Sequence, residues 1–323
     1  MSAACPKLRF HDYQPELASF RSAVLQGLAR DNKWIPPKFF YDQRGSLLFE
    51  AILEQPEYYL PKVERQLLQT HAAEMAELIG PGSVLIEPGS GNCEKVRLLL
   101  AALSPAAYVP MDISGDFLFT SAHELGTDFP RLPIYATCLD FTHTMNLPGN
   151  VPDGRRVLFF PGSSLGNFEP VEAQHFLLRA GRLVGAGGGL LIGMDRKKDK
   201  RVLEAAYNDR AGITADFNLN LLARINQQLD GDFDLDAFAH YACYNELLGR
   251  IEMHLTSLKL QLVEVAGQSF QFLAGERIHT ENSYKYDPAE FVALAQTAGF
   301  RNCRFWTDET GQFGIYYLVF PHD

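Results

Sequence analysis

The stretch LIEPGSGNCEKVRLLL, from Leu85 to Leu100, decides the fold class of this chain. Together with Val84, its first three residues form the run Val84–Glu87, whose three apolar residues are typical of a buried strand. The next four residues, Pro88–Gly91, predict a tight turn. Apolar residues then recur three and four positions apart between Val96 and Leu103. The stretch therefore predicts a strand, a glycine-rich turn and a helix in succession.

The chain around this stretch places it in a parallel sheet. Apolar, strand-like runs alternate with helix-like segments, and the runs are SVLIE, AYVPMD, PIYATCLDF, RRVLFF and GLLIGMD. That alternation is typical of a parallel sheet covered by helices. Near the carboxyl terminus, FRNCRFWTDETGQFGIYYLVF predicts two strands joined by a turn that contains glycine. We predict an α/β fold with a Rossmann-like, mostly parallel sheet that ends in an antiparallel strand pair.

The alternation stops after Asp195. A polar, helix-favouring stretch leads into RIEMHLTSLKLQLVEVAGQSFQF, where apolar and polar residues alternate as they do in antiparallel strands. Residues 12–79 have helical periodicity. We predict two domains: a cofactor-binding domain made of residues 80–195 and 282–323, and a second, substrate-binding lobe made of residues 12–79 and 196–281.

Composition narrows the class of function. The chain has 323 residues, 46% of them hydrophobic and 21% charged, which is typical of a globular protein. Its formal net charge of -10 repels a phosphate backbone and anionic lipid. Without an apolar run long enough for a signal peptide or a membrane span, we expect a cytoplasmic protein. We also expect a monomer that binds neither nucleic acid nor membrane. The five cysteines are scattered and form no CxxC pair, so we expect no disulfide framework and no bound metal.

Residues at three successive strand ends point to a nucleoside-containing cofactor. Gly89 lies in the turn after the first strand, where backbone N–H groups can approach a ligand. Asp112 ends the second strand, where a carboxylate can accept hydrogen bonds from both ribose hydroxyls. Asp140 and Phe141 follow the third strand and suit the amino group and flat face of adenine. Each residue taken singly is as typical of a helix cap, a turn or a surface acid.

The turn favours S-adenosylmethionine over a dinucleotide. The dinucleotide fingerprint needs a third glycine where this chain has Glu94. An NAD-dependent oxidoreductase is therefore the weaker alternative. The loop after the fourth strand, Phe159–Phe168, lacks the (N/D)PP(Y/F) sequence of methylases that act on nucleobase amines. Its small polar residues can instead hold a small substrate, although a simple Gly-Ser turn has the same composition. These residues are Gly162, Ser163, Ser164 and Asn167.

Over nearly its whole length the chain resembles the histidine-specific methyltransferases of ergothioneine biosynthesis. The matching stretches include FYDQRGSLLFEAILEQPEYY, PGSGNCEK, YVPMDIS, PGSSLGNF, YNDRAGITADFNLNLLARIN, HTENSYKY and FWTDETGQFGIYYL. The resemblance implies a class I methyltransferase sheet and trimethylation of the α-amino group of L-histidine to hercynine. It also implies S-adenosyl-L-methionine as the methyl donor and S-adenosyl-L-homocysteine as the product.

The resemblance assigns site residues position by position. The cofactor would be bound by Gly89, Lys95, Asp112, Asp140 and Phe141. Of the substrate residues, those that hold the reacting amine would be Tyr41, Gly162 and Asn167. Those that bind the carboxylate would be Tyr58, Asn167 and Tyr207, and those that surround the imidazole would be Met253, Glu281 and Ser283. The family commonly has leucine where this chain has Pro88, and valine where it has Asn282.

These residue types suit an in-line displacement at a sulfonium. An α-amino group has a pKa near roughly 8, so part of it is already neutral in the cytoplasm and no strong general base is required. Two alternatives remain open at this point. One is a methyltransferase that acts on a different amino acid or an imidazole compound, and the other is a non-catalytic protein that retains the cofactor fold.

Overall fold

The computed structural model describes residues 7–13 and 17–322, and the chain divides into two units. Unit 1 consists of Met1–Pro15, Leu60–Lys197 and Lys285–Asp323. Unit 2 consists of Glu16–Tyr59 and Lys198–Tyr284. The second unit is therefore formed by two segments of the chain that are distant in sequence, and its boundaries differ from the predicted residues 12–79 and 196–281.

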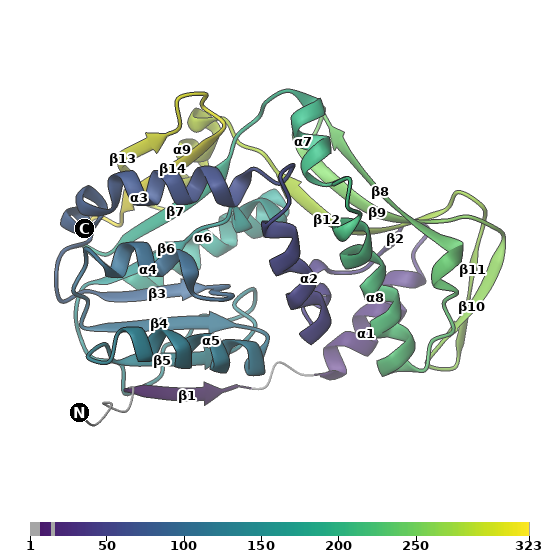
Figure 1. Ribbon diagram of the computed structural model, residues 1–323, viewed down its shortest axis with the longest axis horizontal. Coiled ribbons are helices and arrows are strands. Elements are labelled where there is room, and N and C mark those ends of the chain that lie inside the picture. Colours follow the sequence, from purple (N-terminus) through teal and green to yellow (C-terminus); the bar gives the residue numbers. More distant parts are fainter. Residues whose placement is uncertain (1–6, 14–16, 323) are drawn as a thin grey trace. The chain divides into compact units, whose positions relative to one another are not determined.

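Unit 1 is built on an eight-stranded sheet in the order β1-β5-β4-β3-β6-β7-β14-β13. The strands are β1 (Leu8–Asp12), β3 (Val84–Pro88), β4 (Ala107–Asp112), β5 (Ile134–Cys138), β6 (Arg156–Phe160), β7 (Gly189–Asp195), β13 (Arg301–Thr307) and β14 (Phe313–Val319). The first six in spatial order are parallel, whereas β14 is antiparallel to both β7 and β13. The predicted Rossmann-like sheet with a terminal antiparallel pair is confirmed (Figure 1).

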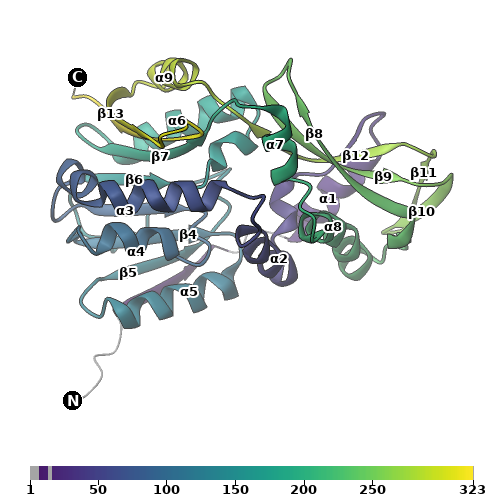
Figure 2. The same ribbon diagram turned by 45° about the horizontal axis from the view of Figure 1, so that its top comes forward.

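Helices cover both faces of this sheet. One face carries α3 (Leu60–Ile79), α4 (Glu94–Leu100) and α5 (Gly115–Asp128), and the other carries α6 (Pro170–Val184) and α9 (Pro288–Thr297) (Figures 1 and 2). Both α6 and α9 begin with a proline in the first turn and a capping box. These caps satisfy N–H groups that a helix start leaves unpaired. Among the described residues, no helix combines the length and apolar character needed to cross a membrane.

Two features of unit 1 differ from the sequence-based expectation. Strand β1 pairs with β5 at the edge of the sheet, although its residues, LRFHD, are only partly buried and give no buried-strand pattern. Helix α3 belongs to unit 1, so the boundary predicted at residue 79 lies at Leu60. The periodicity of the sequence shows that helix α3 buries one face. It cannot show that this helix contacts β7 and β14 of unit 1.

Unit 2 combines helices with a small sheet and a hairpin. The four-stranded sheet has the order β2-β12-β9-β8, and β10 pairs with β11. Its strands are β2 (Lys33–Trp34), β8 (Phe238–Asn245), β9 (Arg250–Ser257), β10 (Gln261–Val265), β11 (Gln268–Phe272) and β12 (Arg277–Tyr284). Its helices are α1 (Leu17–Leu28), η1 (Pro37–Phe40), α2 (Gln43–Leu53), α7 (Lys200–Ala206), α8 (Ile213–Leu229) and η3 (Leu235–Ala237). The antiparallel strands predicted after residue 228 are confirmed.

Strand β12 contains a bulge that decides which side chains share a face. His279 lies opposite His254, whereas Glu281 lies opposite Met253, so Thr280 is an extra residue in the ladder. A bulge of this kind shifts the alternation of side chains by one position. Glu281 therefore lies on the same face as Ile278, which is buried in the apolar core of unit 2.

Candidate active site

The glycine-rich turn after β3 is tied to the neighbouring strand. Gly89 and Gly91 have positive φ angles of 67° and 52°, a region that glycine adopts without strain. The N–H groups of Gly89 and Ser90 both donate to the carbonyl oxygen of Met111, at 2.7 and 3.1 Å. The turn is thus held in one conformation before helix α4 begins at Glu94.

Asp112, at the end of β4, lies beside this turn. Its Oδ2 accepts the N–H of Gly91 at 3.1 Å, and its Oδ1 accepts the N–H of Ser114 at 3.0 Å. Burial raises the pKa of Asp112, while these backbone donors act in the opposite direction. The structure therefore brings together the glycine turn and the carboxylate that the sequence predicts as a ribose ligand.

Phe141 also lies against the turn. A Cβ atom added to Gly89 would be 3.4 Å from the ring of Phe141, so the ring closely covers this glycine. The preceding residue, Asp140, accepts the N–H of Thr142 at 3.0 Å. The features predicted at three strand ends are therefore neighbours at the carboxyl edge of β3, β4 and β5, the edge where ligands bind in sheets of this type.

A buried carboxylate connects Lys95 to the loop after β6. Glu64, from α3, is only 1% exposed, and its Oε2 lies 2.7 Å from Lys95 Nζ. The same carboxylate accepts the N–H of Gly162 at 2.8 and 3.0 Å. Gly193, on β7, leaves room for it, because a Cβ there would lie 2.1 Å from Glu64 Oε1. Glu64 was missed by sequence reasoning, since nothing local marks a helical glutamate as the partner of distant residues.

The loop after β6 is shaped by backbone as much as by side chains. Gly162 has a φ of 82° and Ser163 a φ of 59°. The hydroxyl oxygen of Ser163 accepts the N–H of Asp195 at 2.9 Å, which ties the loop to the end of β7. Asn167 ends the short helix η2 (Ser164–Asn167) that follows. The predicted small, polar loop is thus an ordered turn that positions the N–H of Gly162.

A second buried carboxyl group lies at the end of β3. Glu87 is 2% exposed and accepts a hydrogen bond from the hydroxyl of Tyr108. Burial raises the pKa of Glu87 to about 8, and burial likewise raises the pKa of Cys93 to about 12. Cys93 is therefore a protonated, buried thiol in the interior of unit 1.

Unit 2 brings together five of the predicted substrate residues. The hydroxyl of Tyr207 donates to Ser283 Oγ at 2.8 Å, and the rings of Tyr58 and Tyr207 meet edge-on with centroids 5.9 Å apart. Glu281, two residues before Ser283, faces Met253 across the β9–β12 ladder. Four of the five residues are buried, with Glu281 8% exposed and Met253 2% exposed. These four are Tyr207, Met253, Glu281 and Ser283.

Tyr41 belongs to the same unit but comes from its helical part. It follows η1, and its ring packs edge-on against Phe49 and Phe217 with centroids 5.6 and 5.8 Å away. The sequence-predicted residues thus divide by unit. Those in unit 1 are Gly89, Lys95, Asp112, Asp140, Phe141, Gly162 and Asn167, and those in unit 2 are Tyr41, Tyr58, Tyr207, Met253, Glu281 and Ser283.

A parallel sheet with a glycine turn, a ribose-type acid and an aromatic residue at successive strand ends defines a Rossmann-like methyltransferase that uses S-adenosylmethionine. Comparison with known families makes the identification specific. The chain belongs to the histidine-specific, S-adenosylmethionine-dependent methyltransferases, whose family model matches residues 20–320.

Curated relatives agree with this family. The chain is 40% identical over 304 residues to the histidine N-alpha-methyltransferase of Mycolicibacterium smegmatis, with 92% of this chain and 94% of the relative covered. It has the same identity and coverage with the protein of that name from Mycobacterium tuberculosis. It is 32% identical to ergothioneine biosynthesis protein 1 of Neurospora crassa, where the match covers 88% of this chain and 33% of the relative.

Proposed function

We propose that this enzyme transfers three methyl groups to the α-amino nitrogen of free L-histidine and so produces hercynine, the first step of ergothioneine biosynthesis. The observation that carries the proposal is the arrangement of Glu281, Ser283 and Met253 on one face of the unit 2 sheet. A carboxylate, a hydroxyl and an apolar wall match the two nitrogens and the flat faces of an imidazole. The names of the 40% identical relatives support the same substrate.

The residues of unit 1 fit S-adenosylmethionine. At Gly91 a Cβ would meet no atom within 4 Å, so a ligand can approach this backbone closely. We assign Asp112 to the ribose hydroxyls, and Asp140 with Phe141 to the adenine. Lys95 is assigned to the carboxylate of the cofactor, and Gly89 to the close approach of backbone and ligand. When bound, the cofactor supplies an electrophilic methyl group on a sulfonium.

Three neutral groups suit the carboxylate of the substrate. We assign the hydroxyls of Tyr58 and Tyr207 and the amide of Asn167 to this role, because they are neutral donors that add no cation near the sulfonium. The proton that Tyr207 donates to Ser283 would turn to the carboxylate when the substrate binds. Tyr41, Gly162 and Asn167 are assigned to the amine. Their task is to hold the nitrogen lone pair on the axis of the bond that breaks, since orientation supplies much of the rate of such reactions.

The chemistry needs no strong base from the protein. An α-amino group with a pKa near roughly 8 is partly neutral at cytoplasmic pH, and each methylated amine can lose a proton to water before it attacks again. A trimethylated nitrogen has neither a proton nor a lone pair, so transfer ends at three. We further propose that the enzyme acts as a monomer in the cytoplasm, on the free amino acid.

One incubation tests the proposal. L-Histidine is mixed with the enzyme and S-adenosylmethionine, and the products are resolved by mass spectrometry. A mass gain of three methyl groups on the α-nitrogen, with release of S-adenosylhomocysteine, is the expected outcome. Parallel reactions with tryptophan and with imidazole compounds that lack the α-amino group test the alternative substrates. Faster turnover of any of these than of histidine would reject the assignment.

A further inference from the structure

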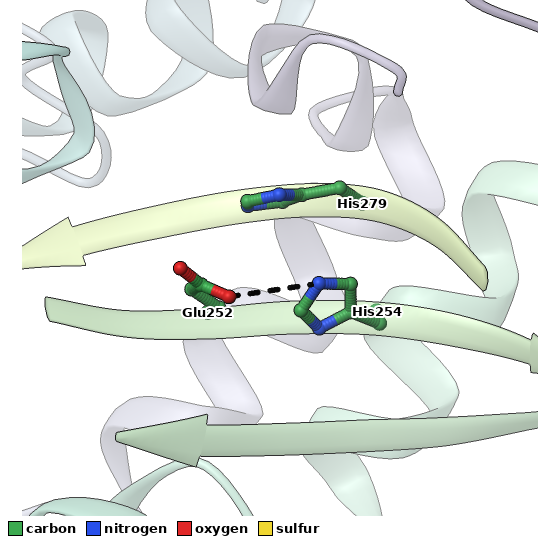
Figure 3. A group of neighbouring side chains, drawn as sticks. All are labelled: Glu252, His254 and His279. Carbon is green, nitrogen blue, oxygen red and sulfur yellow. Dashed lines mark ion pairs between the residues drawn. The ribbon is translucent and has the colours of Figure 1, made fainter. Parts of the chain in front are cut away.

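Three side chains with metal-ligand chemistry lie together on the sheet of unit 2. Glu252 and His254 come from β9, and His279 comes from β12, directly opposite His254 in the ladder (Figure 3). Because side chains alternate along a strand, Glu252 and His254 lie on the face opposite to that of Met253. The cluster is therefore distinct from the residues assigned to the imidazole of the substrate.

The distances suit one shared ion. One ligand atom from each residue lies within 4.8 Å of the other two, and Glu252 Oε2 lies 3.8 Å from His254 Nε2. The two imidazole rings have centroids 4.6 Å apart. In a tetrahedral zinc site with bonds of about 2.1 Å, neighbouring ligand atoms are about 3.4 Å apart. No separation between the ligand atoms of the cluster exceeds this spacing by more than about 1.4 Å.

Neighbouring groups orient these ligands. Glu252 Oε1 accepts hydrogen bonds from Arg250 Nε at 2.8 Å and from Asn245 Nδ2 at 3.1 Å, and Oε2 is the oxygen that faces His254. The Nε2 of His279 lies 3.0 Å from the carbonyl oxygen of Glu281. A carbonyl only accepts, so Nε2 carries the proton and the ring lone pair is on Nδ1. Outer hydrogen bonds of this type are typical of metal-binding histidines.

His254 has a ring nitrogen that makes no hydrogen bond among the described residues. The residue is 9% exposed, and its Nδ1 is buried without a hydrogen-bond partner among the described residues. The other ring nitrogen, Nε2, is the atom that faces Glu252, at 3.8 Å from Oε2. A metal shared with Glu252 would therefore bind Nε2 and leave the ring proton on Nδ1.

Nearby charge selects the class of metal. The guanidinium of Arg250 bonds Glu252 and the hydroxyl of Tyr284. A cation bonded to the carboxylate ligand weakens any purely electrostatic site, which disfavours Mg²⁺ and Ca²⁺. Ions that bind imidazole nitrogen strongly are less affected, and these are Co²⁺, Ni²⁺, Cu²⁺ and Zn²⁺.

We propose that Glu252, His254 and His279 form a binding site for a divalent transition-metal ion of the zinc class, which bridges β9 and β12. Three protein ligands leave at least one coordination position for water. The ion would join the two strands that carry Met253 and Glu281 on their other face. Since the ion binds the folded sheet and not the unfolded chain, it stabilises unit 2 by mass action.

The test uses the full chain, freed of any histidine tag and stripped with a chelator. Co²⁺ is titrated and followed by its visible absorption, and Zn²⁺ is then added to displace it. The same titration is made with His254→Ala, His279→Ala, Glu252→Gln and the control His175→Ala, which removes an exposed histidine of unit 1. Circular dichroism establishes that each variant is folded.

We expect one Co²⁺ per chain, displaced by Zn²⁺, with binding unchanged in the control and at least tenfold weaker in both histidine variants. Glu252→Gln is expected to weaken binding less than either. No saturable binding by the wild-type chain, or equal binding by the two histidine variants, would overturn the proposal. X-ray absorption of the Zn²⁺-loaded wild type gives an answer that does not depend on the variants. Two imidazole ligands without sulfur support the site, and a sulfur ligand places the ion on a cysteine instead.

Discussion

Glu64 and Lys95 form an ion pair whose two partners differ sharply in their access to water. The Oε2 and Nζ atoms are 2.7 Å apart, and the side chain of Glu64 is 1% exposed, whereas that of Lys95 is 24% exposed. The carboxylate also accepts the N–H of Gly162, so it joins helix α3 to α4 and to the loop after β6. An unpaired charge is costly only where water cannot reach it, so the two partners are not equivalent.

Removal of Lys95 should therefore destabilise unit 1 more than neutralisation of Glu64. Lys95→Ala leaves a buried carboxylate without its cation, and we expect a loss of roughly 3 to 5 kcal/mol in the free energy of unfolding. Glu64→Gln keeps an acceptor for Gly162 and leaves an ammonium that water can solvate, so we expect about 1 to 2 kcal/mol. Urea denaturation at neutral pH measures both. Lys62→Ala, at an exposed position of α3, is the control, and a larger loss for Glu64→Gln than for Lys95→Ala would contradict this account.

Glu281 should control recognition of histidine under the proposed function. A charge-assisted hydrogen bond contributes roughly 1.5 to 3 kcal/mol. We therefore expect Glu281→Ala to lower kcat/KM for histidine by about one to two orders of magnitude. Steady-state kinetics with histidine and with other amino acids measure the effect. Glu264→Ala, at an exposed position of β10, should leave the kinetics unchanged. An undiminished preference for histidine in Glu281→Ala would remove this residue from the binding site.

Much of the fold could be predicted, because the strands of unit 1 are short apolar runs separated by clear turns. Much of the cofactor side could be predicted as well, since Gly89 and Asp112 lie at strand ends and strand ends meet at one edge of a parallel sheet. The substrate side could not be derived in this way. The simple alternation of β12 would place Glu281 on the face opposite to Ile278, and only the bulge at Thr280 brings them together.

The other contacts that could not be predicted from the sequence join segments that are far apart in the chain. Glu64 lies 98 residues from Gly162, and no spacing rule connects them. Glu252 and His254 form a Glu-x-His pattern, but their third partner, His279, lies on another strand and is recognised only from the register of the sheet. Periodicity therefore predicts which elements form, and tertiary pairing decides which polar groups meet.

Glu87 should lower the stability of the folded protein progressively between about pH 4.5 and pH 8. Its pKa is raised in the folded chain to about 8 from an ordinary value of 4.5. Below this window both states are protonated, and within it the unfolded chain gains charge more readily than the folded one, so folding loses stability as pH rises. Glu87→Gln removes this group, and its stability relative to the wild type should rise by up to about 1.4 kcal/mol per pH unit across the window.

Urea denaturation of both proteins at several pH values measures this difference. A constant offset is expected from the buried amide, so the slope against pH is the relevant quantity. Glu77→Gln, at an exposed position of α3, serves as the matched control. A difference between Glu87→Gln and the wild type that stays level between about pH 5 and pH 8 would show that Glu87 is already ionised in the folded state.

Two lysines near the points where the chain leaves and re-enters unit 1 make ion pairs of similar length in opposite environments. Lys285 Nζ lies 2.8 Å from Asp195 Oδ2, and both side chains are 0% exposed. Lys197 Nζ lies 2.6 Å from Glu290 Oε1, with side chains 34% and 48% exposed. The Asp195 main chain is also fixed, because its carbonyl accepts the N–H of Tyr286 at 3.1 Å. Lys197 Nζ also lies 3.9 Å from Asp287 Oδ2, whose side chain is 52% exposed, so the comparison sets a buried ion pair against an exposed cluster of charges.

We expect Lys285→Met to lower the free energy of unfolding by roughly 3 to 5 kcal/mol, because it removes the cation that pairs with the buried Asp195 carboxylate at 2.8 Å. Lys197→Met should cost less than about 1 kcal/mol, since water solvates Glu290 and Asp287, the partners that remain. The double variant Lys285→Met/Asp195→Leu should recover most of the loss, because no buried charge is left unpaired. Thermal and urea unfolding of the four proteins measure these differences. Equal losses for the two single variants, or no recovery in the double variant, would show that the stability of the protein does not depend on pairing the two buried charges.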